Sequence, residues 1–353
     1  MSHPYSGAPA YRRWRSGVAA MPPGDLDPVV EFPFLISRTD RIAAAGSCFA
    51  QHVARHLRGR GFDFLDEEPA HPLLPADTAA RYGYNLFSAR YGNVYTSRQL
   101  LQLLRRAYGR FVPSEDAWSD EGRVYDPFRP GIQPGGFATR QEYELDRIQH
   151  FAAVRRVFEQ ADVLVFTLGL TECWASRDDG AVYPLCPGTL AGSFDPQRHQ
   201  FLNLEVEDIQ ADMQAFIDEL RQVNPRVRLI LTVSPVPLSA TALDRHVLVS
   251  TTLSKAVLRV AAERLCQLPG VAYFPAYEII TAPSAGASYF AEDLRSIREQ
   301  GVEHVMRVFF RHLCATPGEA VPVAAQEPGF VSRMHDVVDA MCDEARLDPP
   351  PPA

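Results

Sequence analysis

The chain of 353 residues is predicted to fold as an α/β protein, a three-layer α/β/α sandwich with a parallel sheet. Short and almost wholly apolar runs, such as 163–168, alternate with segments in which apolar residues recur at helical spacing. The apolar runs end at glycine or polar residues, as buried parallel strands do at a turn. Ligands bind beyond the carboxyl ends of the strands in such sheets. We therefore expect the functional residues there.

Each element of the sandwich follows from the same periodicities. The first helix shows Ala50, Val53, Ala54 and Leu57 on one face, directly after an apolar run. A box of Ser296 and Glu299 predicts the start of the last core helix. The predicted strands are 42–45, 62–65, 163–168, 227–233 and 271–274, and the further helices are 100–108, 145–158, 209–220, 253–265 and 296–312.

The predicted organisation is one large domain with short tails. Residues 1–36 are polar and Pro-rich, and we expect them to form an arm laid over the domain. The domain itself covers 37–315, with loop insertions near 111–140 and 175–203. The tail 316–353 is expected to hold one short helix before its Pro-rich end.

Composition narrows the class of protein. The net charge of −8 argues against a nucleic-acid partner, which needs a basic surface. No stretch reaches the ~18 apolar residues of a membrane span, and the first residues lack the apolar core of a secretory signal. The six cysteines are far apart and form no CxxC pair, which favours neither a zinc site nor a disulfide framework. We expect a cytoplasmic protein with no metal or organic cofactor, and its oligomeric state stays open.

The turn between the first strand and the first helix carries the chemistry. Ser47 and Cys48 lie where backbone N–H groups and the positive end of the helix dipole converge. A hydroxyl or thiol there can act as a nucleophile, and the N–H groups can stabilise an oxyanion. The alternative is that Gly46 and Ser47 only turn the chain and that Ser47 caps the helix. We expect Cys48 to be buried by packing.

Gly46-Ser47-Cys48-Phe49-Ala50 resembles the motif that gives the GSCFA family its name. That family belongs with the SGNH (GDSL-like) hydrolases, so the resemblance implies a flavodoxin-like sheet and Ser47 as nucleophile. Residues 167–174 are similar to the family's third block, which implies oxyanion roles for Gly169 and Thr171. Tyr84-Asn85 resembles the second block, which adds Asn85 as a donor. Turn chemistry is the alternative explanation for Asn85 and Thr171.

The chain departs from the SGNH pattern at the base. Related enzymes place an Asp and a His three residues apart before the last helix, whereas this chain has Asp293 and Ser296. Serine cannot accept the proton. We predict His246 as the base, oriented by Asp293 or Glu278, with His304 and His199 as alternatives. Each of these histidines also has a purely structural interpretation.

The predicted function is hydrolysis of an acyl ester on a glycan or another small metabolite. The residues expected to contact the substrate are Glu172, Trp174, Lys255 and Glu278. The two alternatives are an O-acyltransferase with an acyl-CoA donor and a catalytically silent binding domain. His52 and His56 have the spacing of a metal pair, but we expect them on a solvated helix face.

Overall fold

The computed structural model describes residues 3–314 and Leu347. Its main sheet is parallel, with the strand order β1-β4-β8-β9. These strands are β1 (Ile42–Gly46), β4 (Val163–Leu168), β8 (Arg228–Val233) and β9 (Val271–Tyr273). The predicted strand at 62–65 is reduced to a parallel bridge between Phe64 and Ile42 on the free edge of β1. Counting this bridge, the order along the chain is 2-1-3-4-5, which is the flavodoxin-like order.

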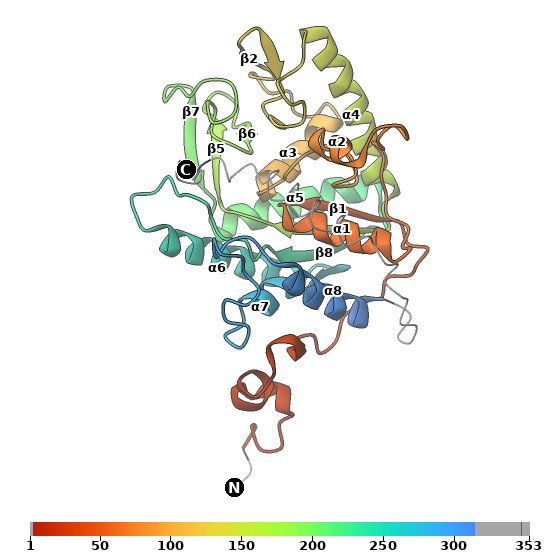
Figure 1. The fold of residues 1–353 in the computed structure, drawn as a ribbon, viewed down its shortest axis with the longest axis vertical. Helices are drawn as coiled ribbons and strands as arrows, with labels where there is room; N and C mark the ends of the chain where they lie inside the picture. Colours follow the sequence, from red (N-terminus) through yellow and green to blue (C-terminus); the bar gives the residue numbers. More distant parts are fainter. Residues whose placement is uncertain (1–2, 315–346, 348–353) are drawn as a thin grey trace.

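Helices cover both faces of the sheet, which confirms the predicted three-layer α/β sandwich (Figure 1). Alternate side chains of β4 enter the two cores, Leu164 and Phe166 on one face and Val163 and Val165 on the other. The first face packs against α3 (Ser97–Ala107), α4 (Arg140–Gln160), α5 (Val206–Val223) and α6 (Val247–Leu265). The second face packs against α1 (Phe49–Gly59), α7 (Ala276–Thr281) and α8 (Glu299–Leu313). The short helix α2 (Ala76–Arg81) lies between α1 and α3 in sequence.

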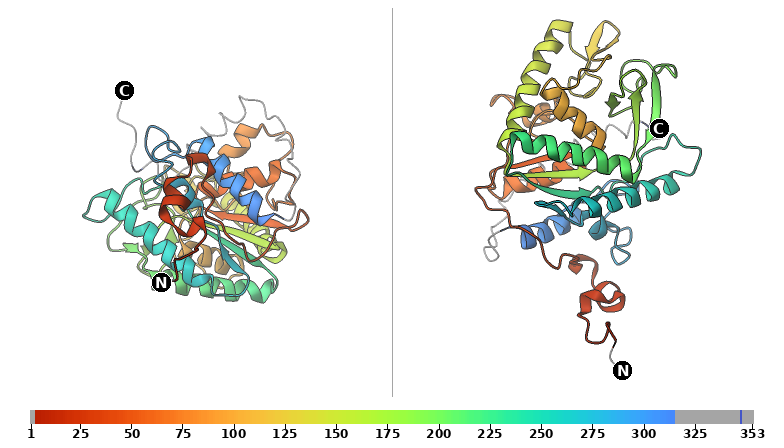
Figure 2. Two further views of the ribbon diagram at one scale, coloured as in Figure 1. Left: turned by 90° about the horizontal axis from the view of Figure 1, so that it is seen from below. Right: turned by 180° about the vertical axis from the view of Figure 1, so that it is seen from behind.

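Two small antiparallel sheets lie on the α3–α4 side of the main sheet (Figures 1 and 2). The hairpin lies within the insertion expected near 111–140, and the other sheet begins just before the one expected near 175–203. The hairpin pairs β2 (Trp118–Asp120) with β3 (Arg123–Tyr125). The other sheet has the order β6-β5-β7 and contains β5 (Glu172–Ser176), β6 (Val182–Tyr183) and β7 (His199–Asn203).

The N-terminal arm packs on the domain from about residue 21 onward. Leu26 is buried, and its carbonyl oxygen accepts a hydrogen bond from His304 of α8. The preceding short helices η1 (Ala10–Arg12) and η2 (Arg15–Ala19) project from the body, and η3 (Pro23–Asp25) leads into it (Figure 2). The helix expected in 316–353 falls outside the described residues. Within the described part of the chain, we find no helix with the length and apolarity that crossing a membrane requires.

Two helix starts differ from the prediction. Helix α8 begins at Glu299 with Arg298 as its N-cap, because the Ser296 hydroxyl donates to Asp293 instead of capping the helix. Helix α4 begins at Arg140, capped by the side chain of Thr139. Its first half has a polar inner face, which apolar periodicity does not detect.

Candidate active site

Gly46 lets strand β1 approach β4 closely at the edge where Ser47 begins. Its φ is +141°, and a Cβ at this position would lie 2.6 Å from the carbonyl oxygen of Thr167. Any other residue would therefore push β1 away from β4 or distort the turn. The turn places Ser47 beyond the carboxyl end of β1 and just before α1, as predicted.

The Ser47 hydroxyl is buried and has no hydrogen-bond partner in the described part of the chain; only 3% of the residue is exposed. Ser47 does not cap α1, whose N-cap is Cys48 and which has no side-chain cap. This excludes the capping alternative. The hydroxyls of Thr167 and Thr232, paired in register across β4 and β8, are also buried without a partner there. An unsatisfied buried hydroxyl costs about 1–3 kcal/mol, so a row of them indicates a place where a ligand or water supplies the partner.

Gly169 packs against Ser47, but its N–H group is not available to an oxyanion. A Cβ on Gly169 would lie 3.1 Å from the Ser47 Cβ. The N–H groups of Gly169 and Leu170 both donate to the carbonyl oxygen of Tyr95, at 3.0 Å each. The prediction of Gly169 as an oxyanion donor is therefore wrong, because its donor already stabilises the loop after β4.

Lys255 fixes this same loop from α6. Its ammonium group donates to the carbonyl oxygen of Gly169 at 2.7 Å, and the residue is 1% exposed. One residue earlier, the Ser254 hydroxyl accepts the N–H group of Thr171 at 3.2 Å. Thr171 is thus buried at the expected edge of the sheet, next to Gly169. Lys255 serves this loop at the site and is not a surface cation.

Asn85 lies at the wrong end of α1. It is exposed, and its carbonyl oxygen accepts a hydrogen bond from Arg58. Arg58 lies near the C-terminal end of α1, about 16 Å from Ser47 by the helical rise. Its φ of +62° is a conformation that asparagine tolerates, so the turn explanation holds for Asn85. The prediction of Asn85 as an oxyanion donor is wrong.

The segment 93–95 is the part of this site that sequence reasoning missed. The N–H group of Val94 donates to the carbonyl oxygen of Gly46 at 2.9 Å, so the segment crosses the end of β1. Asn93 is 6% exposed and immediately precedes this contact. The only sequence signal was the Gly92-Asn93 pair, in a stretch that contains several Gly and Asn residues.

Neither His304 nor His199 can serve as a base for Ser47 in this arrangement. His304 Nδ1 lies 2.7 Å from the Tyr289 hydroxyl oxygen, and its Nε2 donates to the carbonyl oxygen of Leu26. This packed core position is the structural interpretation weighed for His304. His199 accepts the N–H group of Asp195 at Nδ1, and its Nε2 lies 3.1 Å from a carboxylate oxygen of Glu115. Both predictions are wrong, because all four ring nitrogens have other partners.

His246 is exposed and caps α6. Its Nδ1 accepts the N–H group of Leu248 at 3.1 Å, and its Nε2 has no partner within residues 3–314. The histidine does not hydrogen-bond to Ser47 in this conformation. Glu278 does not orient a histidine, because it accepts from Arg259 at 2.9 Å and from the Tyr273 hydroxyl at 2.8 Å.

Asp293 is satisfied by its own turn. Its Oδ1 accepts the N–H groups of Arg295 and Ser296 at 2.9 Å, and its Oδ2 accepts the Ser296 hydroxyl at 2.7 Å. Partial burial acts to raise the pKa of Asp293, but these hydrogen bonds outweigh it and lower the pKa. Ser296 thus takes the hydrogen bond that the missing histidine would form in related hydrolases. The carboxylate is ionised and has no histidine to orient.

Glu172 and Trp174 lie on β5, which directly follows Thr171. Glu172 accepts the Thr241 hydroxyl at 2.7 Å and the N–H group of Ala242 at 3.2 Å, which ties the loop after β8 to β5. Trp174 packs edge-on against Phe194 and Phe201, with ring centroids 5.1 and 5.7 Å apart. These contacts give both residues a structural role, and contact with a substrate stays a prediction.

His52 and His56 were predicted to lie on a solvated face of α1, and this prediction is wrong for His52. His52 is 6% exposed, since this face packs toward the start of α8. Arg55 forms an ion pair of 2.7 Å with Glu299, and His56 lies 3.5 Å from the same carboxylate.

Among the residues that the structure describes, no group of three or more His, Cys, Asp or Glu side chains could hold a metal ion. Cys48 is buried and has no disulfide.

The fold and site define an α/β sandwich protein with a buried, unpartnered serine at the carboxyl edge of a parallel sheet. Residues 41–309 match the GSCFA family, and the chain belongs to it, which confirms the predicted resemblance. A comparison with curated proteins finds no match.

Two solved structures show only remote similarity to the chain. One is a carbohydrate esterase family 3 from Talaromyces cellulolyticus, with 15% identity, a TM-score of 0.27, and coverage of 61% of this chain and 87% of that one. The other is an acetyl esterase mutant S10A with acetate ion, with 14% identity, a TM-score of 0.25, and coverage of 69% and 92%. Similarity at this level defines no activity for this chain.

Proposed function

We propose that the protein hydrolyses an acyl ester of a glycan or another small metabolite, with Ser47 as the nucleophile. One observation carries the proposal: the Ser47 hydroxyl is buried at the start of α1 with no partner in the described part of the chain. A structural serine would use its hydroxyl to cap the helix or to bond a neighbour. A nucleophile instead keeps it for the substrate.

The proposed reaction has two halves. The Ser47 oxygen attacks the ester carbonyl carbon, the alcohol leaves with the serine proton, and a water molecule then hydrolyses the acyl-serine to a carboxylic acid. The first N–H groups of α1 and the helix dipole favour negative charge on the carbonyl oxygen. Thr171 remains a proposed side-chain donor to this oxygen. Asn93 replaces Asn85 as the second, because it borders the end of β1.

His246 is retained as the proposed base. Of the three histidines considered, it alone keeps a ring nitrogen without a partner within residues 3–314. The histidine belongs to the loop that follows β8 at the carboxyl edge of the sheet. The loop must move toward β1 for His246 to reach Ser47. Asp293 is the proposed carboxylate partner, which requires its bond to Ser296 to open.

A catalytically silent binding domain is the second candidate. The observation that favours it is the Asp293–Ser296 hydrogen bond, because it replaces the Asp–His pair of related hydrolases. In such a domain the Ser47 hydroxyl would donate to a bound ligand and would never lose its proton.

A fluorophosphonate probe separates the two candidates. An activated serine becomes covalently labelled, so wild-type protein should react and Ser47→Ala should not. Ser234→Ala is the matched control, because Ser234 is a buried serine that follows β8 at the same edge. Labelling of neither the wild type nor the variants would support the silent domain and overturn the hydrolase.

The base is tested separately by hydrolysis of p-nitrophenyl acetate. His246→Gln should lower kcat by about 10²–10⁴, the usual contribution of a general base. His71→Gln is the control, because His71 is also an exposed histidine whose Nδ1 accepts the N–H group of the residue two positions later, here Leu73. An unchanged kcat in His246→Gln would exclude His246 as the base.

A further inference from the structure

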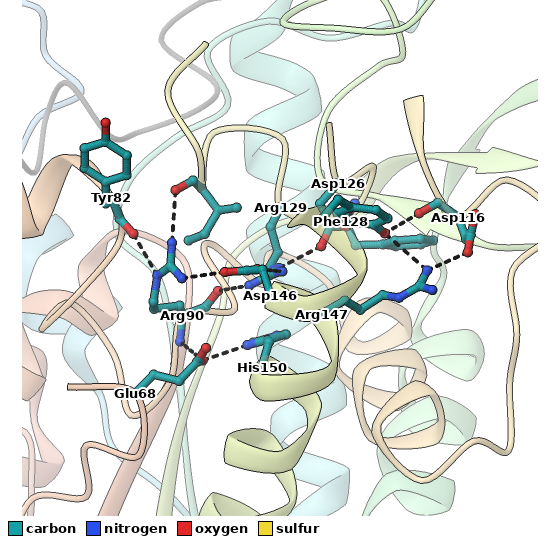
Figure 3. Close-up of polar contacts among 12 residues, drawn as sticks. Glu68, Tyr82, Arg90, Asp116, Asp126, Phe128, Arg129, Asp146, Arg147 and His150 are labelled. Atoms are coloured by element: carbon teal, nitrogen blue, oxygen red, sulfur yellow. Dashed lines mark hydrogen bonds and ion pairs between the residues drawn. The ribbon is translucent and has the colours of Figure 1, made fainter. Parts of the chain in front are cut away.

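A second group of buried polar residues has no part in the Ser47 site. It lies where α4 meets α3 and the insertion before α4 (Figure 3). Arg129 bridges Asp126 and Asp146 at 2.8 and 2.7 Å, and Arg90 adds a second contact to Asp146 at 2.8 Å. The group comprises the arginines Arg90, Arg106, Arg129 and Arg147 and the carboxylates Glu68, Asp116, Asp126 and Asp146.

A cavity of about 20 Å³ lies beside this group, and Arg106 and Arg129 are the two members that line it. One water needs roughly 10–15 Å³ of such volume, so the cavity has room for one to two water-sized groups. Its polar lining consists of side chains that are each no more than 9% exposed: Asn93, Gln99, Gln102, Arg106, Arg129 and His150. Buried polar groups that converge on one cavity need hydrogen-bond partners there, which water or a small ligand can supply.

Two groups that line the cavity have hydrogen-bonding capacity left for a ligand, the Arg106 guanidinium and His150 Nε2. Arg106 is 8% exposed and forms no hydrogen bond or ion pair with any described residue. Its guanidinium lies over the Phe128 ring, 3.5 Å from the centroid, and burial lowers its pKa to about 10. His150 is 1% exposed, and its Nδ1 donates to Glu68 at 2.7 Å. The other ring nitrogen, Nε2, is buried and has no partner in the described part of the chain.

We propose that this cavity binds a small carboxylate anion together with one proton. One carboxylate oxygen accepts from the Arg106 guanidinium, and the other accepts from His150 Nε2 once that nitrogen carries the proton. A short carboxylate suits the volume, and Leu103 and Val182 supply an apolar surface for its carbon atoms. Arginine is the side chain that best matches the two oxygens of a carboxylate.

The proton follows from the charges around the cavity. Next to the cavity, three arginines balance three carboxylates, so a bound anion alone would leave one negative charge in excess; these groups are Arg90, Arg106, Arg129, Glu68, Asp126 and Asp146. Burial is the main cause that lowers the pKa of His150, and Arg129 adds to it, while Glu68 and Asp126 oppose it. The empty site therefore holds a neutral imidazole whose Nε2 lone pair would repel an anion. Protonation of Nε2 removes this repulsion and restores the charge balance.

Isothermal titration calorimetry with sodium acetate tests the proposal on the wild-type protein. Titrations in two buffers with different ionisation enthalpies should count the uptake of about one proton per acetate bound. The apparent Kd should rise about tenfold between pH 6.5 and pH 7.5. Binding without proton uptake, no binding, or equal displacement by chloride would each overturn the proposal.

Variants locate the binding. Arg106→Met should weaken acetate at least tenfold, whereas Arg147→Met should not, because Arg147 pairs with Asp116 away from the cavity lining. Equal affinity in Arg106→Met and the wild type would refute the assignment. Ser47→Ala should bind acetate as the wild type does, which separates this site from any product site at Ser47. If Arg106→Met does not fold, the proposal is decided by two measurements on the wild-type protein: the number of protons taken up per acetate and the displacement of acetate by chloride.

Discussion

Replacing Gly46 by alanine tests whether the close approach of β1 to β4 positions Ser47. The new Cβ would lie 2.6 Å from the Thr167 carbonyl oxygen and 2.7 Å from its Cβ. Ordinary contacts begin near 3.4 Å, so backbone has to move by almost an ångström. Such overpacking costs about 1–3 kcal/mol, and the unfavourable φ of +141° costs about 1–3 kcal/mol more. The expected loss of unfolding free energy is therefore about 2–6 kcal/mol.

Gly109→Ala supplies the matched control for Gly46→Ala. Gly109 also has a positive φ, +67°, but nothing lies within 4 Å of a Cβ built there. It should lose only about 1–2 kcal/mol, the cost of the left-handed conformation. Urea unfolding at 25 °C measures both variants, and the fluorophosphonate probe then reports on Ser47 under conditions in which each is folded. Equal losses in the two variants, or full labelling of Gly46→Ala, would refute the argument.

Three further predictions follow from other contacts. Ser296→His should raise p-nitrophenyl acetate hydrolysis at least tenfold if this segment still faces Ser47, and no gain would contradict that placement. Arg129→Met should lower the unfolding free energy by about 3–5 kcal/mol, because it leaves the 1% exposed Asp126 without its partner; an equal loss in the more exposed Arg147→Met would contradict this. Burial acts to raise the pKa of Glu68, but contact with His150, the charge of Arg129 and the backbone N–H group of Arg90 outweigh it and lower the pKa to about 2. The unfolded chain thus binds the proton first, and stability on the order of 3 kcal/mol should be lost as pH falls from 4.5 to 2. Urea midpoints of the wild type and Glu68→Gln check this, and parallel acid profiles would contradict it.

The main sheet was predictable because its strands are buried on both faces. Such strands are nearly continuous apolar runs, and β4 begins and ends where the sequence predicts. The first half of α4 was not predictable in the same way. Leu145 and Ile148 have helical spacing but are 55% and 63% exposed, while Tyr143 and His150 are buried. The helix packs its polar residues against a charged insertion, which reverses the usual relation between hydrophobicity and burial.

The site could be predicted only as far as local geometry determines it. A strand, a glycine and a helix start place Ser47 at the sheet edge whatever the rest of the chain does. Asn85 and Asn93 both occur in Gly-rich turns, and only the hydrogen bond from Val94 to Gly46 distinguishes the residue near the site. The histidines were indistinguishable in sequence, because the groups that occupy their ring nitrogens come from distant elements.

The contrast between Ser47 and Asp293 bears on whether the protein is a catalyst. Asp293 accepts three hydrogen bonds within its own turn, so its presence has a structural explanation and does not support catalysis. Ser47 has no such explanation. Alanine at this position would remove an unsatisfied buried hydroxyl at no cost in packing, and would stabilise the fold by up to about 1–3 kcal/mol. A hydroxyl that lowers the stability of the fold in this way implies that its partner arrives with a ligand or substrate. The serine, and not the Asp-x-x-Ser segment, is therefore the residue on which the hydrolase proposal rests.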